Sequence, residues 1–111
     1  SSSILINWST ERERRIEVTF GIAYGEKIDE ARKAVLALAG NDPRILQTPA
    51  PVIYVSQLAD SSVNLELRVW VRPADYLDVR SDILEGIYDT LNEKNISIPF
   101  PQLTVHMEKE S

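Results

Sequence analysis

The sequence predicts an α+β domain of the ferredoxin-like type, a βαββαβ sandwich with two helices on one face of a mostly antiparallel sheet. Several segments alternate apolar and polar residues, two longer segments repeat apolar residues at helical spacing, and their order is β-α-β-β-α-β. The 111 residues suffice for one domain with a modest core. A further strand-like segment lies at each end, an N-terminal strand remnant and a C-terminal strand.

The first third of the chain predicts a strand followed by a helix. Apolar side chains alternate with polar or small ones in Ile16–Tyr24, which is typical of a strand with one buried face. Gly25 predicts a turn. Apolar residues in Glu26–Ala39 recur at the spacing of an amphipathic helix. We expect Gly40 to follow the last helical residue, where glycine is favoured.

The middle of the chain predicts a hairpin. Val52–Leu58 and Val63–Val71 are strand-like, and Ala59–Ser62 is rich in turn-forming residues. Alternation in the first and third strands predicts a polar face on the sheet. This face carries Glu17, Thr19, Glu66, Arg68, Trp70 and Arg72.

The last third predicts a helix and two short strands. Ala74–Glu93 has helical periodicity, and Asp75 is the predicted N-cap. Asn95 is expected to adopt the left-handed conformation after the helix. We expect Ile96–Ile98 to form a short fourth strand. Gln102–Met107 then predicts a final strand, separated from the domain by Pro99-Phe100-Pro101.

The composition argues against several classes of function. Twelve basic and seventeen acidic residues give a net charge of −5, which disfavours nucleic acid and anionic lipid as partners. The chain has no cysteine and a single histidine, His106, so we expect no metal site and no cofactor. Neither a nucleophile elbow nor a phosphate-binding glycine loop is present. We therefore expect no enzymatic activity.

Trp70 is the most informative side chain on the predicted polar face. It lies between Arg68 and Arg72 on the third strand. RNA-binding domains of this topology stack bases on such aromatics, but they carry aromatic and glycine-rich signatures on two strands and a basic surface, which this sequence lacks. Aromatic and arginine side chains also favour contacts between proteins. A subunit or domain contact and packing against the chain's own N-terminal segment both remain open.

Six segments of the sequence are informative for the family of the protein. They are Ser1–Ser9, Phe20–Tyr24, Asp42–Leu46, Leu58–Leu65, Arg68–Val71 and Asn95–Gln102. In these segments the sequence resembles the small-conductance mechanosensitive channels, the MscS-like family. The resemblance runs through almost the whole chain in the right order, and the stretch from Asn95 to Gln102 is its most distinctive part.

The resemblance implies a cytoplasmic assembly domain of a channel that releases ions and small osmolytes under membrane tension. Residues 1–14 would be the trailing strand of a truncated middle β domain plus a linker, 15–98 the ferredoxin-like α/β domain, and 99–111 a strand that joins its copies in a barrel. The subunits would form a homo-heptamer in the inner (plasma) membrane. This chain would lie on the cytoplasmic side and reach the membrane only through N-terminal helices that it lacks.

Candidate interface residues follow from the polar face and from the resemblance. They are Ile4, Leu5, Ile6, Trp8, Arg68, Trp70, Phe100, Leu103 and Val105. The alternative function is a stand-alone ferredoxin-like module that binds a small ligand or a protein. An enzyme on this topology would require converging ionisable groups around Tyr24–Lys27.

Overall fold

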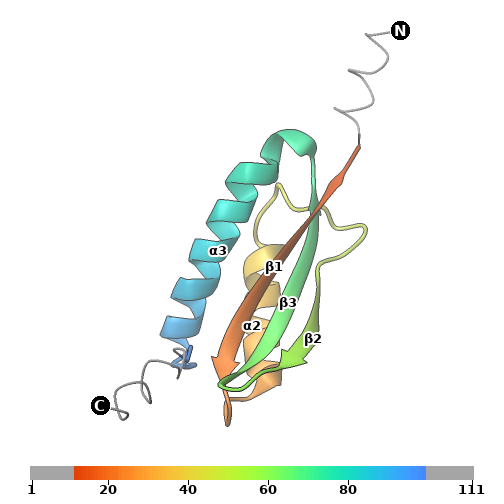
Figure 1. The fold of residues 1–111 in the computed structure, drawn as a ribbon. Helices are drawn as coiled ribbons and strands as arrows, with labels where there is room; N and C mark the ends of the chain where they lie inside the picture. The colour runs from red at the N-terminus through yellow and green to blue at the C-terminus, as the bar shows by residue number, and fades with distance from the viewer. Residues whose placement is uncertain (1–11, 100–111) are drawn as a thin grey trace, which may run out of the picture.

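The computed structural model describes residues 12–99 and contains a three-stranded sheet and two long helices. Figure 1 shows both helices on the same side of the sheet, with α3 (Tyr76–Glu93) beside β1 (Arg14–Ala23). This arrangement confirms the predicted α+β architecture. The strands predicted near the two chain ends lie outside the described residues. In chain order the elements are β1 (Arg14–Ala23), α2 (Ile28–Gly40), β2 (Val52–Leu58), β3 (Ser62–Val71), the 3-10 helix η1 (Pro73–Asp75) and α3 (Tyr76–Glu93).

The sheet has the strand order β1-β3-β2, and both neighbouring pairs are antiparallel. Because β1 and β2 each run antiparallel to β3, they are parallel to one another with β3 between them. This is the split β-α-β arrangement that the element order predicted. β3 therefore forms the centre of the sheet, and β2 forms one edge.

The predicted fourth strand at Ile96–Ile98 does not form. A single backbone hydrogen bond joins this segment to β1, from the Ala23 N–H to the Ser97 carbonyl at 2.9 Å. The Ser97 N–H donates instead to the Glu26 carboxylate at 3.1 Å. The Ala23 carbonyl accepts the Glu26 N–H at 3.2 Å. A ladder cannot start here because Glu26 occupies both groups that would form its second hydrogen bond.

The hydrophobic core lies between the sheet and the two helices. Alternate residues of β3, from Val63 to Val71, are buried. The predicted helical periodicity of α3 is confirmed, since Val79, Ile83, Ile87 and Leu91 are all at most 3% exposed. Among residues 12–99 no polar or charged residue is fully buried. The fold of the described residues therefore depends on apolar packing around β3.

The ends of the helices differ from the prediction. α2 begins at Ile28, and Gly40 is its last residue instead of following it, because Asn41 continues the helical hydrogen bonding. Asp75 lies at the N-cap of α3 but its side chain makes no capping hydrogen bond, since the 3-10 helix leads directly into α3. The positive φ angles of Gly25 (97°) and Asn95 (60°) confirm the predicted turn and left-handed residue.

Arg44 connects the loop after α2 to α3. Its Nη2 lies 2.8 Å from Asp42 Oδ2 and 2.9 Å from Asp82 Oδ2. The hydrogen bond from Arg44 holds the pKa of Asp42 below its ordinary value of 3.8. The next residue, Ile45, is buried and bridges to Val71 at the end of β3. The ion pairs therefore fix the loop where it closes one end of the core.

Replacing Asp42 with Asn is expected to destabilise the fold at neutral pH and much less in acid. The pKa of Asp42 is lower in the folded state than in the unfolded state, so its contribution is present above about pH 4 and is lost as the pH falls through the folded value. Urea unfolding at about pH 7 and about pH 2.5 would measure this difference. Asp82→Asn is the control, because the Asp82 side chain is 58% exposed whereas the Asp42 side chain is 15% exposed. An equal loss at both pH values for Asp42→Asn would contradict the prediction.

Candidate functional site

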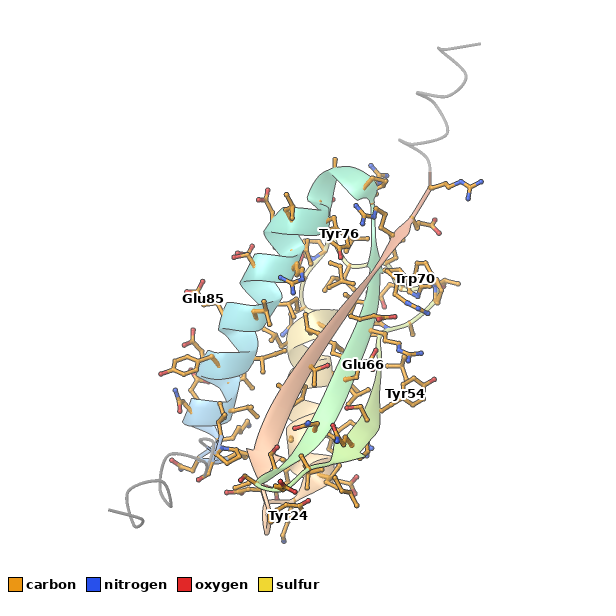
Figure 2. All side chains as sticks on the ribbon, viewed as in Figure 1. Tyr24, Tyr54, Glu66, Trp70, Tyr76 and Glu85 are labelled. Atoms are coloured by element: carbon orange, nitrogen blue, oxygen red, sulfur yellow. The ribbon has the colours of Figure 1, made fainter. Side chains whose placement is uncertain are left out.

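The face of the sheet that turns away from the helices is the candidate site. Side chains alternate along a strand, so the residues of β1 and β3 that do not enter the core project from this face. Figure 2 shows Trp70, Glu66 and Tyr54 projecting from it, opposite the helical layer. We call it the open face. It consists of Arg15, Glu17, Thr19, Tyr54, Glu66, Arg68 and Trp70.

Arg68 is the central cation of the open face. Its Nε donates a hydrogen bond to Glu66 Oε2 at 3.0 Å, which raises the pKa of Arg68 above its ordinary value. Its guanidinium carbon lies 4.9 Å from the centroid of the Tyr54 ring on β2. The strand register also places Glu17 of β1 directly opposite. Arg68 is therefore held between both neighbouring strands.

The second cation of the open face, Arg15, lies beside the tryptophan. Arg15 Nη2 is 2.6 Å from Glu17 Oε2, and the Arg15 guanidinium carbon is 5.8 Å from the Trp70 ring centroid. Arg15 and Trp70 are direct cross-strand partners. Trp70 is partly buried, with Arg15 across the strand and Arg68 two residues away on its own strand.

The structure brings Arg68 and Trp70 together on one face, as the alternation predicted. The open face also includes Arg15 and Tyr54, which alternation in the sequence did not assign to it. β1 begins at Arg14, before the predicted start at Ile16, so Arg15 belongs to the sheet. Because the first half of β2 is apolar on both faces, alternation does not indicate on which face of the sheet Tyr54 lies. Arg72 follows the last residue of β3 and is not one of the paired residues.

The other predicted interface residues cannot be placed on this face. Seven of the nine candidates, those before Arg12 and after Pro99, lie outside the described residues. They are Ile4, Leu5, Ile6, Trp8, Phe100, Leu103 and Val105.

The arrangement of the open face suits binding better than proton transfer. Its two arginines lie beside carboxylates, so both signs of charge are interspersed with aromatic rings.

Among the described residues, no group of three or more metal-binding side chains occurs. Two groups in the Tyr24–Lys27 loop have structural partners: the Tyr24 hydroxyl donates to the Ala59 carbonyl, and the Glu26 carboxylate accepts the Ser97 N–H.

Between residues 12 and 99, neither helix combines the length and the apolar composition needed to cross a bilayer.

An α+β domain whose open face carries two arginine–carboxylate pairs beside aromatic rings has the composition of a surface that binds another protein. Residues 16–98 match the family described as mechanosensitive ion channel MscS, C-terminal. The chain therefore belongs to the MscS family and corresponds to its C-terminal domain. The predicted family is confirmed, and this family is one of channels rather than enzymes.

Relatives and a solved structure agree with this assignment. The chain is 40% identical to an uncharacterized MscS family protein of Synechocystis, covering 93% of this chain and 35% of that protein. It is 38% identical to a small-conductance mechanosensitive channel of Edwardsiella ictaluri, covering 93% and 36% respectively. The closed-state crystal structure of Helicobacter pylori MscS aligns with a TM-score of 0.74 at 31% identity, covering 79% of this chain and 35% of that one. The chain thus spans about a third of the length of these relatives.

Proposed function

We propose that this chain is the cytoplasmic assembly domain of a mechanosensitive channel subunit, and that it has no enzymatic activity of its own. The observation that carries the proposal is the family match over residues 16–98, on a chain that covers only about a third of its channel relatives. The whole channel would open under membrane tension and release ions and small osmolytes. The domain would join the subunits together below the pore.

The open face supports an assembly role because of its composition. Tryptophan, tyrosine and arginine are enriched in protein–protein contacts relative to other surfaces. Trp70 and Tyr54 are here held by Arg15 and Arg68 without being fully buried. A partner surface could cover the rings while the rim charges stay paired. We propose another copy of the same chain as that partner, with seven copies in the assembled channel.

The two ends of the chain have separate places in this proposal. Residues 1–14 would complete a middle β domain, and residues 99–111 would supply one strand of a barrel formed by all the copies. The apolar residues Ile4, Leu5 and Ile6 would then lie in the β domain, and Leu103 and Val105 in the barrel. The membrane would be the inner membrane, reached only through helices that precede this segment.

The proposal is tested on the full-length protein that contains this segment. Patch-clamp recording should show a conductance that opens with membrane tension, and the residues before Ser1 should include apolar segments of roughly 20 residues. Light scattering on the 111-residue chain should show self-association. A full-length protein without such apolar segments would exclude the channel function. Binding of a small ligand by a monomer would instead favour the stand-alone module.

A further inference from the structure

The helices cover the two outer strands of the sheet unequally. The helix-facing residues of β1, such as Val18, are buried, and α3 lies beside this strand (Figure 1). On β2 the coverage is incomplete. Val55 pairs with the buried Leu65 of β3 but is itself 42% exposed. Leu58 pairs with the buried Val63 and is 68% exposed. The helix layer therefore stops short of the second half of β2, where an apolar strip stays open along the edge.

β2 also lacks the features that usually protect an edge strand. Natural sheets guard a free edge with charged side chains or proline, because its unpaired N–H and C=O groups can bind another strand. Val52–Leu58 contains no charged residue and no proline. Its one irregularity is the shift in register between Val55 and Gln57. Within the described residues, no further strand pairs with this edge. The edge of β2 is therefore suited to a contact with another chain.

At the opposite end of the sheet, α3 exposes apolar side chains. Gly86 of α3 faces Leu38 of α2, because an added Cβ would lie 2.9 Å from the Leu38 methyl carbons. Leu84 and Leu77 precede Gly86 by two and nine residues. At about 100° of rotation per residue, both lie on the side of α3 away from α2. Both are exposed, and only the uncharged Ser81 lies between them on this side. This side of α3 would cover the helix-facing side chains of a strand placed against the outer edge of β1.

Most of the outer edge of β1 is free in the described part of the chain. Its backbone is bonded on this side only through the Ala23 N–H, which donates to the Ser97 carbonyl. Backbone groups alternate in direction along a strand, and the pairing of β1 with β3 is regular from Arg14 to Ala23. The odd-numbered residues from Arg15 to Thr19 therefore also direct their N–H and C=O groups to the outer edge. These groups are available to a neighbouring strand.

The free part of this edge lies beside Leu77 and Leu84. The Arg14 guanidinium carbon lies 3.9 Å from the Tyr76 ring centroid, so β1 and α3 begin at the same end of the domain. At the other end, the segment after α3 closes on β1, and Tyr88 lines a surface pocket formed there with that segment. Tyr88 therefore lies beside the chain's own segment and not beside the free edge.

We propose that the edge of β2 in one copy of the chain packs against the outer edge of β1 and the exposed side of α3 in the next copy. Val55 and Leu58 of the first copy then lie beneath α3 of the second. There they contact Leu77 and Leu84, and apolar surface is removed from water on both sides. This inference rests on the proposed assembly function and names the surfaces that such an assembly uses.

A second copy suits these surfaces for three reasons. The side chains in the contact are uncharged, whereas the whole chain carries a net charge of −5, so its copies repel one another elsewhere. The two surfaces lie at opposite sides of the domain (Figure 1), so each copy offers one to each neighbour, and head-to-tail contacts of this kind can close into a ring. The contact also continues the open face, because Tyr54 of β2 and Arg15 of β1 both belong to that face.

Cysteine cross-linking in the full-length protein tests the contact. The 111 residues contain no cysteine, so Val55→Cys and Leu84→Cys introduce the only thiols of this segment, and any cysteine outside it is replaced by serine. A short thiol-specific cross-linker tolerates distances that a disulfide does not. With both substitutions in every copy, we expect a ladder of products from dimers upward. Either substitution alone should give no product, because the two thiols of one contact belong to different surfaces.

Two further samples define the contact. Co-expression of Val55→Cys copies with Leu84→Cys copies should give cross-linked dimers and nothing larger, since each copy then carries one thiol. The pair Val55→Cys and Tyr88→Cys is the matched control. It should give at least about tenfold less product, because Tyr88 lies at the end of α3 that the chain's own segment covers.

The outcomes separate this inference from the proposed function. Dimers from either single variant would show a two-fold contact and overturn the inference, as would a double variant without products or a control pair that cross-links equally well. Patch-clamp recording of the same protein tests the channel function independently. A tension-gated conductance without cross-linked products would overturn only the inference. Products in a protein without such a conductance would support the contact and remove the channel function.

Discussion

Replacing Leu67 with Ala is expected to cost about 2–5 kcal/mol in the free energy of unfolding, the usual range for a buried leucine. Leu67 is fully buried in the central strand. Its partners are Val18 on β1 and Ile53 on β2, both also in the core. The cavity left by the substitution would be enclosed by strands on both sides and by the helices, so it cannot collapse easily.

Leu77→Ala is the matched control for this prediction. Leu77 lies on α3 with 76% of its surface exposed, so the same substitution should change stability by at most about 0.5 kcal/mol. Chemical denaturation of both variants, followed by circular dichroism, gives the two values. A loss for Leu67→Ala no greater than that for Leu77→Ala would show that the packing around β3 is not what holds the fold together.

Periodicity was enough to predict most of the elements. The structure gives β2 the bounds Val52–Leu58, as predicted, and it buries apolar residues of α3 at helical spacing from Val79 to Leu91. These signals are local and repeat over two or more turns or several alternations, so they are visible in one sequence. The helix ends at Gly40 and Asp75 were predicted less well because they depend on hydrogen bonds of single residues.

Features that depend on pairing between distant segments could not be predicted. Ile96–Ile98 has the composition of a strand, but Glu26 takes the Ser97 N–H from another part of the chain. Arg15 lies on the open face because it pairs with Trp70 of β3, and this pairing cannot be seen in the sequence of β1 alone. Alternation within one strand predicted correctly that Arg68 and Trp70 share a face, whereas the face of Tyr54 required the register of β2 against β3.

Replacing Trp70 with Ala is expected to weaken self-association by at least about 2 kcal/mol, roughly 30-fold in the dissociation constant. Trp70 is the largest side chain of the open face, and Arg15 and Arg68 border it on two sides. Tryptophan and arginine are enriched among the few interface residues that supply most of the binding energy. Arg68→Ala should weaken association in the same direction, because it also leaves the Glu66 carboxylate without its partner. Sedimentation velocity over a concentration series measures both effects.

Tyr88→Ala is the control for Trp70→Ala, because Tyr88 is an exposed aromatic residue on α3 and not on the open face. Denaturation of each variant separates a loss of folding from a loss of association, since Trp70 also packs partly against its own sheet. If the open face joins the copies, Trp70→Ala should yield a folded chain that dissociates while Tyr88→Ala associates normally. Equal association of both variants would remove the open face from the proposed assembly and leave the chain ends as its remaining contacts.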